Sequence, residues 1–257
     1  MAADRVRQLG GAPGDRPPGD EEHSRTGASV VVATVGRPHR LARLVDAVLT
    51  DPAAAELVVV VDGPDQRSVT VLESLAVTRP RLHPVTVPHQ GQLGALATGV
   101  RIAAYDLIVL LDDDVLPAPG TIAGHVAAHR DRPGSVVVGP MPVALDPLDG
   151  DRGRSRDGRR PGVATRLYAA EYDAHLDALG RRDVDVLDVL WTGNLSIGRD
   201  DCLRVGLPSP AFTAHYHADQ DLGLRLRAAG LVGRLDPSLV ARHFHDRTDA
   251  DFLRDAR

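Results

Sequence analysis

The sequence predicts an α/β protein with a mostly parallel sheet and helices on both faces of that sheet. Between residues 28 and 140, short apolar runs rich in β-branched residues alternate with segments of helical periodicity. This alternation is typical of parallel strands joined by crossover helices. In addition, the run at 57–61 is apolar at every position, as expected for a strand that is buried on both faces.

The composition limits the possible classes of protein. The chain has 257 residues, 43% of them hydrophobic, and a formal net charge of −5. This is enough to build a core, and the negative balance argues against nucleic acid as a partner, because phosphate binding favours a basic surface. The single cysteine, Cys202, excludes an intrachain disulfide and a cysteine-built zinc site. No apolar run approaches the roughly 18 residues of a membrane span, and the N-terminus lacks the apolar core of a signal peptide, so we expect a cytoplasmic protein without a transmembrane segment.

The first half of the chain contains five predicted strands separated by four predicted helices. Residues 1–27 lack periodicity and are rich in Gly, Pro and charged residues, so we predict a disordered tail. The predicted strands are 28–36, 56–65, 82–88, 106–114 and 135–140. The predicted helices are 37–50, 68–77, 92–105 and 118–130. Pro38 suits the first turn of the first helix, and Pro84 predicts that the third strand lies at a sheet edge.

The second half of the chain has a weaker pattern. A charged, glycine-rich loop at 146–162 precedes a predicted helix at 163–179. Residues 185–200 have strand character, 219–230 form a clear helix closed by Gly230, and 238–246 are predicted to be a final short strand. We therefore divide the domain into residues 28–140 and 141–257.

Polar residues and glycines follow three of the predicted strands. They are Thr34 to Gly36, Asp62 to Asp65, and Asp112 to Asp114. Open sheets of this kind bind ligands beyond the carboxyl ends of their strands. We therefore expect these three strand ends to crowd one rim of the molecule and to form its ligand site.

Three consecutive carboxylates follow the apolar strand in LIVLLDDDVLPAPG (107–120). If the strand continues, alternation brings Asp112 and Asp114 together and points Asp113 away. Two converging carboxylates suit Mg²⁺ or Mn²⁺, which often take one or two protein carboxylates and complete their shells with substrate phosphates and water. The alternative is a solvated acidic turn, but the position at the predicted ligand rim favours a functional site.

Other residues have both a functional and a structural interpretation. Asp62 can accept hydrogen bonds from a ribose or base, or form an ordinary turn. Trp191 can be a core residue, whereas the turn at Gly193 and Asn194 can hold a polar acceptor.

Acids and histidines near the C-terminus are similarly open to two interpretations. Asp219 lies at a predicted helix start, where acids normally act as caps. His243 and His245 lie two apart, so they share one face of an extended segment and can complete a metal site or touch phosphate, or simply be surface histidines. The arginines of 152–160 can grip a diphosphate or only solvate a loop.

Taken in order, these segments resemble the family 2 glycosyltransferases of the GT-A fold. The matching stretches are SVVVATVGRPHRLARLVDAVL, LVVVVDGPD, LIVLLDDDVLPAPGTI, WTGNLSIGRDDCLRVG and ADQDLGLRLRAAG. They extend from about residue 29 to 245. The resemblance implies a single Rossmann-like GT-A domain, in which residues 28–140 bind a nucleotide diphosphate sugar and residues 141–257 bind the acceptor.

The resemblance also implies roles for individual residues. The family's DxD motif corresponds to Asp112–Asp114, with Asp114 as the metal ligand and Asp112 or Asp113 near the ribose or the metal. Asp219 corresponds to the general base, and His243 or His245 to a late histidine on the metal or diphosphate. The resemblance implies a nucleotide pocket lined by Thr34, Gly36, Arg37 and Asp62, and an acceptor side lined by Trp191, Gly193 and Asn194.

The sequence departs from the family pattern in three places. Ala218 stands before Asp219 where the family usually has Glu, and Val61-Asp62-Gly63-Pro64 stands where the family often has Asp-Asp-Gly-Ser. Leu96-Ala97-Thr98 replaces Ala-Arg-Asn, so a diphosphate or sugar contact is lost or supplied elsewhere, by Gln90 or Gln92. The Gln-x-x-Arg-Trp motif of processive synthases is absent, which favours a single transfer.

We therefore expect a metal-dependent, inverting glycosyltransferase. Its donor would be a UDP-, GDP- or dTDP-sugar and its cofactor Mn²⁺ or Mg²⁺, with an acceptor that the sequence does not identify. Two alternatives remain open: a sugar nucleotidyltransferase, for which the expected lysine is absent, and a degenerate GT-A domain that binds nucleotide sugar or a partner without turnover. A dehalogenase-type phosphatase fits poorly, because Leu116 and Pro117 follow the acids.

Overall fold

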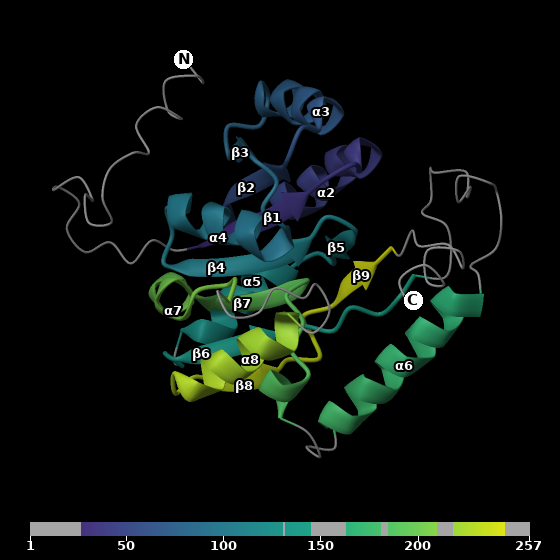
Figure 1. Cartoon of the computed structure of the whole chain (residues 1–257), viewed down its shortest axis with the longest axis vertical. Coiled ribbons are helices and arrows are strands. Elements are labelled where there is room, and N and C mark those ends of the chain that lie inside the picture. The colour runs from purple at the N-terminus through teal and green to yellow at the C-terminus, as the bar shows by residue number, and fades with distance from the viewer. Residues whose placement is uncertain (1–26, 131, 145–162, 181–184, 210–217, 245–257) are drawn as a thin grey trace, which may run out of the picture.

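The computed structural model describes residues 27–130, 132–144, 163–180, 185–209 and 218–244. The predicted tail up to residue 26, the arginine-rich loop at 146–162 and His245 lie outside the described residues. The central feature is a seven-stranded sheet with the order β3-β2-β1-β4-β7-β6-β8 (Figure 1). Its strands are β1 (Ala28–Thr34), β2 (Ala54–Asp62), β3 (Leu82–Val87), β4 (Leu107–Asp112), β6 (Ser135–Val138), β7 (Asn194–Gly198) and β8 (Val232–Leu235).

The sheet is mostly parallel, as the sequence predicts. β1 pairs in parallel with both β2 and β4, and β2 pairs in parallel with β3. β3 forms the edge of the sheet, which confirms the expectation from Pro84. In the described part of the sheet, β7 is the strand that runs antiparallel to its neighbours, β4 and β6.

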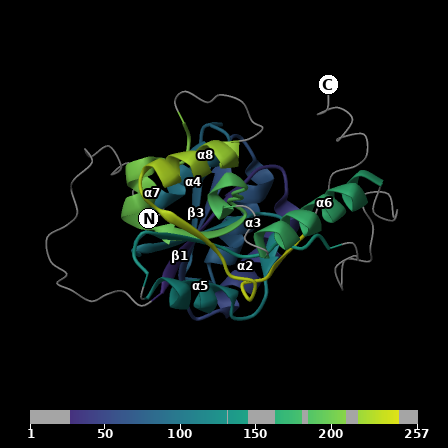
Figure 2. The ribbon, with the colours of Figure 1, turned by 90° about the horizontal axis from the view of Figure 1, so that it is seen from below.

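Helices cover both faces of the sheet. They are α2 (Pro38–Thr50), α3 (Gln66–Ala76), α4 (Gln92–Ile102), α5 (Thr121–His129), α6 (Val163–Gly180), α7 (Arg199–Val205) and α8 (Ala218–Ala228), with the 3-10 helix η1 (Val186–Asp188). Figure 2 shows α4, α7 and α8 above the sheet and α2 and α5 below it. The strand side chains alternate accordingly: Val31 packs with α4, whereas Val30 and Val32 pack with α2.

The periodicity of α2 shows why it forms where the sequence predicts. Leu41, Leu44, Val45 and Val48 are fully buried on one face, and Pro38 occupies the first turn, where a missing N–H has no cost to the helix. At about 25 cal/mol per Å² of apolar surface, each fully buried aliphatic side chain stabilises the fold by roughly 1.5–3 kcal/mol. Burial of this face holds α2 against the sheet and keeps the first turn of the helix beside the carboxyl ends of the strands.

The second half of the chain differs most from the sequence prediction. The segment 185–200 is not one strand: it contains η1, a turn, β7 and the start of α7. Asp185 caps η1 by accepting a hydrogen bond from the backbone N–H of Leu187. β8 is half exposed and has no clean apolar alternation, which is why the sequence pattern does not reveal it.

A second, two-stranded sheet forms beside the main one. β5 (Val115–Pro117) pairs antiparallel with β9 (Ala241–His243). β9 is the final strand that the sequence predicts, but it covers three residues rather than 238–246. β4 likewise ends at Asp112 rather than Asp114, because the chain turns there before β5 begins. This turn places all three aspartates at the junction between the two sheets.

The two predicted halves share one sheet rather than forming two layers. β7 and β8 come from residues after 140, yet β7 inserts between β4 and β6 of the first half. The acceptor-binding role of the second half remains a proposal.

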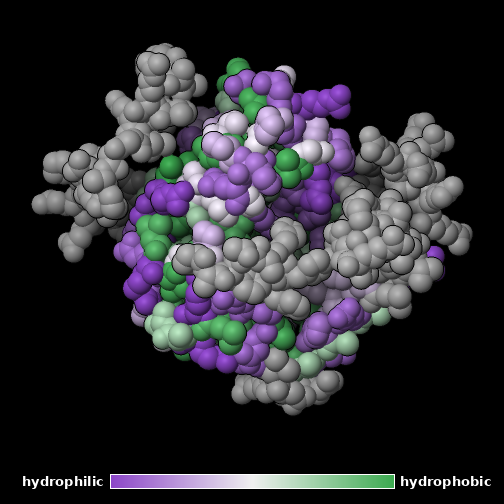
Figure 3. Space-filling model, in the orientation of Figure 1, coloured by the Kyte–Doolittle hydropathy of each residue, from purple (hydrophilic) through white to green (hydrophobic). Residues whose placement is uncertain are grey.

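The surface of the described residues is mixed in character. On the face in Figure 3, hydrophobic areas are interspersed with hydrophilic ones wherever grey atoms do not cover them. Among the described residues, the exposed large hydrophobic side chains come from separate segments. They are Val35, Val77, Leu203, Leu224 and Val232. No helix in the described part of the chain is both long enough and apolar enough to cross a bilayer.

Candidate active site

The carboxyl ends of β1, β2 and β4 meet at one rim of the sheet. Because these strands are parallel neighbours, Thr34, Asp62 and Asp112 end at the same edge. The Thr34 hydroxyl donates a hydrogen bond of 2.7 Å to Asp113, which joins the first strand end to the acidic turn. The backbone N–H of Gly36 donates to the Asp65 carboxylate at 2.7 Å. The structure therefore brings together the three strand ends that the sequence predicts to form the ligand site.

Arg37 and His243 both contact the acidic turn. Arg37 Nη1 lies 2.5 Å from Asp113 Oδ1 and 3.0 Å from Asp114 Oδ2. His243 Nε2 lies 3.4 Å from Asp114 Oδ1. Asp113 does not point away into solvent, as strand alternation predicts, because the strand ends at Asp112 and alternation stops there. Instead, Asp113 is buried and accepts from Thr34 and Arg37.

The pKa values of Asp112 and Asp114, the first and last acids of the turn, shift in opposite directions. Burial, followed by the Asp114 carboxylate, raises the pKa of Asp112 to about 7, and Asp219 adds to the shift. For Asp114, burial acts in the same direction. However, the hydrogen bond and charge of His243, together with Arg37 and Arg40, outweigh it and lower the pKa to about 2. Asp114 therefore stays charged at neutral pH.

Asp112 is fixed between α4 and the turn before β7. Gln92 Nε2 donates to Asp112 Oδ1 at 2.7 Å. Gln92 is one of the two glutamines that the sequence suggests as replacements for a missing diphosphate or sugar contact, and it does reach the acidic turn. The Asp112 backbone N–H donates to the Gly193 carbonyl at 3.2 Å. A Cβ at position 193 would lie only 2.5 Å from Asp112 Oδ2, so glycine is required for this close approach.

β9 delivers His243 to the acidic turn. His243 pairs with Val115 of β5, and the backbone N–H of Phe244 donates to the Asp114 carbonyl at 2.7 Å. The ring of Tyr168, on α6, packs edge-on against the His243 ring at a centroid distance of 6.1 Å. Burial, followed by the charges of Asp112 and Asp114, raises the pKa of Tyr168. Tyr168 is not predicted from the sequence, because its place on a separate helix leaves no local signal.

Asp219 lies in the first turn of α8 and is held by Thr192. The Thr192 hydroxyl donates to Asp219 Oδ1 at 3.1 Å, and the Thr192 backbone N–H donates to Oδ2 at 3.4 Å. Thr192 is buried and directly precedes Gly193. The segment Thr192-Gly193 thus touches both Asp219 and Asp112. The sequence pattern points to the neighbours of Thr192 but not to Thr192 itself.

Trp191 and Asn194 are tied to the interior. Trp191 Nε1 donates to the Gly139 carbonyl at 3.1 Å, and its ring packs against Tyr172. Asn194 is fully buried; its amide nitrogen donates to the Leu239 carbonyl at 2.7 Å, and its Oδ1 lies 3.0 Å from His125 Nε2. The side chain of Asn194 therefore supports the turn from within.

Asp62 is engaged by the loop that follows β3. It accepts hydrogen bonds from the backbone N–H groups of Gln90, at 2.8 Å, and Gly91, at 3.0 Å. His89 Nδ1 lies 2.9 Å from Asp62 Oδ2. Asp62 therefore shapes the rim by holding this loop at the carboxyl end of β2.

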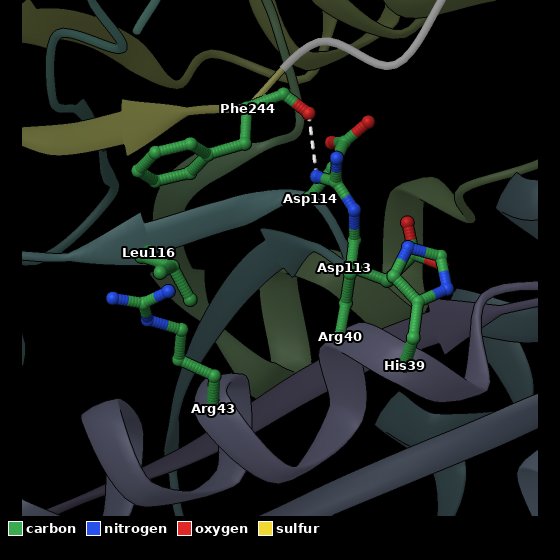
Figure 4. Close-up of a pocket in the computed structure, with 7 residues that line it drawn as sticks. All are labelled: His39, Arg40, Arg43, Asp113, Asp114, Leu116 and Phe244. Atoms are coloured by element: carbon green, nitrogen blue, oxygen red, sulfur yellow. Dashed lines mark hydrogen bonds between the residues drawn. The ribbon is translucent and has the colours of Figure 1, made fainter. Parts of the chain in front are cut away.

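A pocket of about 210 Å³ lies between α2 and the small sheet, directly beside the acidic turn. Its lining residues are His39, Arg40, Arg43, Asp113, Asp114, Leu116 and Phe244. In Figure 4 the three basic side chains rise from α2 toward the strands, and Arg40 donates to the Phe244 carbonyl. Arg40, in the first turn of α2, thus brings a positive charge near Asp114.

The donor set at the turn fits a hard divalent cation. Asp112 and Asp114 would offer carboxylate oxygens to a cation, and His243 an imidazole nitrogen. After burial, the neighbouring negative charges raise the pKa of Asp112, and a cation would relieve this repulsion. Within the described ranges, no three His, Cys, Asp or Glu side chains are arranged to hold a metal ion.

The sheet order and the acidic rim define a glycosyltransferase domain of the GT-A fold. The chain belongs to glycosyl transferase family 2: the model of that family matches residues 29–186, which include the acidic turn. Asp219 and His243 lie beyond the matched residues.

One sequence relative and two solved structures are similar to this chain. The chain is 24% identical over 235 residues to the uncharacterized glycosyltransferase YfnE of Bacillus subtilis (strain 168), covering 79% of this chain and 60% of that protein. It is similar in structure to the mannosyltransferase PcManGT from Pyrobaculum calidifontis, solved in complex with GDP-Man and Mn²⁺ (TM-score 0.59, 18% identity, 94% of this chain and 63% of that chain). It is also similar to GalNAc-T7, solved with UDP, GalNAc and Mn²⁺ (TM-score 0.62, 16% identity, 88% and 45%). The chain thus spans less than two thirds of the length of each.

Proposed function

We propose that this chain transfers a sugar from a nucleoside diphosphate sugar to an acceptor hydroxyl or amine. The observation that carries the proposal is the gathering of Asp112, Asp114 and Asp219 at one rim. Burial and then the carboxylates of Asp114 and Asp219 raise the pKa of Asp112, so the three acids lie within electrostatic reach of one another. Such a site suits a donor that arrives with a cation and an acceptor that must lose a proton.

In this proposal the donor nucleotide lies over the ends of β1 and β2. Thr34, Gly36, Arg37 and Asp113 line it, and Asp62 shapes the adjoining loop. Their convergence on one rim supports the assignment. The solved relatives, whose complexes contain GDP-Man or UDP, support a nucleoside diphosphate donor; the candidates for this chain are UDP-, GDP- and dTDP-hexoses.

Asp114, Asp112 and His243 are the residues that we propose to hold Mn²⁺ or Mg²⁺. When bound, the cation would neutralise negative charge on the departing diphosphate. Asp114 is the principal ligand, because the positive groups around it keep its carboxylate charged. The complexes of both solved relatives contain Mn²⁺, which supports this choice of metal.

Asp219 is the proposed general base. It accepts the proton from the acceptor O–H or N–H as the acceptor atom forms a bond to the anomeric carbon. The bond from that carbon to the diphosphate oxygen breaks, and the nucleoside diphosphate leaves with its electron pair. Attack from the face opposite the leaving group inverts the anomeric centre. Thr192 positions Asp219 through its two hydrogen bonds.

Residues 141–257 form the proposed acceptor side of the site. Trp191 and Gly193 stand at its base, since Gly193 touches Asp112 and Trp191 precedes the threonine that holds Asp219. Tyr168 borders it from α6. A single transfer, rather than processive synthesis, is the expected mode.

Release of nucleoside diphosphate from UDP-, GDP- and dTDP-sugars in the presence of Mn²⁺ tests the proposal. Asp219→Asn should lower turnover by a factor on the order of 10²–10⁴, the usual contribution of a general base, with unchanged nucleotide affinity. Asp114→Asn should abolish the Mn²⁺-dependent part of nucleotide binding. Asp46→Asn, at an exposed ion pair with Arg79, is the matched control and should behave as wild type. Full turnover by Asp219→Asn would refute the base assignment.

A domain that binds nucleotide sugar without turnover is the second candidate. The alanine at position 218, where the family usually has glutamate, is the observation that favours it. Saturable nucleotide-sugar binding with Mn²⁺, combined with no product release for any donor, would support this candidate over the enzyme.

A further inference from the structure

Both oxygens of Asp114 are already engaged by positively chargeable protein groups. Arg37 Nη1 lies 3.0 Å from Oδ2, and His243 Nε2 lies 3.4 Å from Oδ1. The Asp114 side chain is only 9% exposed, so little of the carboxylate remains for a further ligand. Each oxygen keeps a second lone pair, but a cation bound there would lie close to one of these two groups, so that group must move aside.

Arg37 is the group that can be displaced. Its side chain is 34% exposed, against 10% for His243, and it follows β1 in the segment Val35-Gly36-Arg37, before α2 begins. The backbone N–H of Gly36 in that segment is held by Asp65 at 2.7 Å, so Arg37 would leave Asp114 by rotation of its own side chain rather than by movement of the loop. His243, in contrast, has its backbone fixed by the β5–β9 ladder, and as a proposed ligand it would turn to the cation rather than oppose it.

We propose that Arg37 competes with the divalent cation for Asp114 and thereby makes cation binding depend on the nucleoside diphosphate. This inference rests on the proposed function. The guanidinium occupies the inner face of the acidic turn, where it neutralises Asp113 and Asp114 together. When a diphosphate arrives at the same rim, it offers Arg37 an anionic partner, since guanidinium groups bind phosphates through paired hydrogen bonds. Asp114 is then released to the cation.

Cation binding and nucleotide binding are therefore coupled through the side chain of Arg37. Without nucleotide, the cation must break the contacts of Arg37 with Asp114 and gains no phosphate oxygens in return. With nucleotide, Arg37 has a new partner and the cation has further ligands. Coupling is reciprocal, so the nucleotide must strengthen cation binding by the same factor by which the cation strengthens nucleotide binding.

Binding of Mn²⁺ to the full chain, followed by electron paramagnetic resonance and isothermal titration calorimetry, tests this proposal without an activity assay. The probes are Mn²⁺ alone and Mn²⁺ with saturating UDP or GDP, whichever binds. For the wild type, the dissociation constant for Mn²⁺ should be at least tenfold lower with the nucleotide than without it.

Substitution of Arg37 gives the decisive contrast. Arg37→Gln should bind Mn²⁺ alone about tenfold more tightly than wild type, and its coupling factor with nucleotide should shrink, because no guanidinium has to be displaced. Arg37→Lys keeps the positive charge but cannot bridge two carboxylates in the same way, so it should fall between the two. Arg79→Gln removes an arginine from an exposed ion pair near the other end of α2 and should leave both constants unchanged.

The possible results separate this inference from the proposed function. If wild type binds Mn²⁺ equally well with and without nucleotide, or if both Arg37 variants bind Mn²⁺ no more tightly than wild type, the inference fails while the function stands. If no Mn²⁺ binds even with every nucleotide tried, the proposed cation site itself fails. Should Arg37→Gln not fold because it leaves buried carboxylates unpaired, the wild-type comparison and Arg37→Lys still decide the matter.

Discussion

At the scale of single residues, Thr192 joins the two sides of the site. It donates to both oxygens of Asp219, and the next residue, Gly193, packs against Asp112. A shift of Thr192 would therefore disturb the proposed base and the acidic turn together. This is a role that no local motif reveals, because it depends on the approach of α8 to the turn before β7.

Replacing Thr192 with valine removes the hydroxyl at nearly constant volume. A hydrogen bond to a charged acceptor contributes about 1.5–3 kcal/mol, so turnover should fall by roughly 10- to 100-fold, while Thr192→Ser should restore most of it. The measurement is the rate of nucleoside diphosphate release at saturating donor, together with the thermal midpoint.

Thr121→Val is the matched control for this variant. Thr121 is also a buried threonine, and its hydroxyl donates to the Val240 carbonyl at 2.8 Å, away from Asp219. It should lower stability without the same loss of turnover. An equal loss of turnover in both variants would show that Thr192 acts through general stability rather than by holding Asp219.

At the scale of elements, α5 and β7 are joined by a buried polar network. His125 Nδ1 lies 2.7 Å from the Ser196 hydroxyl, and His129 Nε2 lies 2.9 Å from the same atom. The other nitrogen of His125 contacts Asn194, which follows the glycine beside Asp112. Packing of α5 against the sheet thus supports the active-site turn from behind.

This network should make stability depend on pH. Burial lowers the pKa of His125 from 6.5 to about 4, despite the hydrogen bond with Asn194. Between these two values the unfolded chain binds a proton that the folded chain does not, so stability falls as pH drops through 6.5 and levels off below about 4. Burial shifts the pKa of His129 in the same direction.

The size of the effect can be measured by urea unfolding at pH 7.5 and 5.0. The shift of His125 accounts for a loss of about 2 kcal/mol over that interval, at 1.36 kcal/mol per pKa unit. His125→Gln should lose this part of the pH dependence, although its stability at pH 7.5 will be lower. His175→Gln, at an exposed position on α6, should retain it. The same slope in His125→Gln and wild type would contradict the assignment.

The elements also show how far the sequence alone can predict this fold. The strands β1, β2 and β4 were predictable because each contains a continuous apolar run, and α2 because its periodicity is clean. β3, which contains His83, Pro84 and Thr86, has a weaker pattern. In the second half, β7 is a short strand of five residues and β8 is half exposed. Their places in the sheet depend on long-range pairing, which leaves little trace in local pattern.

The sequence likewise predicts some features of the candidate site but not others. The sequence predicts the three strand ends, because parallel neighbours must end together. It does not predict that Arg37 bridges Asp113 and Asp114, or that Thr192 holds Asp219, because these contacts join segments far apart in the chain. Alternation also misplaced Asp113, since it assumes that the strand continues beyond Asp112.

At the scale of the whole molecule, the site lies where the two sheets and both helical layers meet. β1, β2 and β4 supply the strand ends, β9 supplies His243, and α8 supplies Asp219. Segments from nearly the full length of the described chain therefore depend on one another at the rim. A ligand that bridges them should stabilise the fold as a whole rather than one element.

Thermal unfolding with nucleotide and Mn²⁺ tests this expectation. A ligand at about 100 times its dissociation constant stabilises the native state by about 2.7 kcal/mol. For a domain of this size, each kcal/mol raises the thermal midpoint by roughly 2–4 °C, so the correct nucleoside diphosphate with Mn²⁺ should raise it by roughly 5–10 °C. The nucleoside monophosphate should give a smaller shift that Mn²⁺ does not increase, because it lacks the second phosphate. In the Asp114→Asn variant, the nucleoside diphosphate should raise the thermal midpoint only as much as the monophosphate does. The Asp46→Asn variant should respond as the wild type does. A shift independent of Mn²⁺ in the wild type would mean that the nucleotide binds without the cation, and the acidic turn would then need a different explanation.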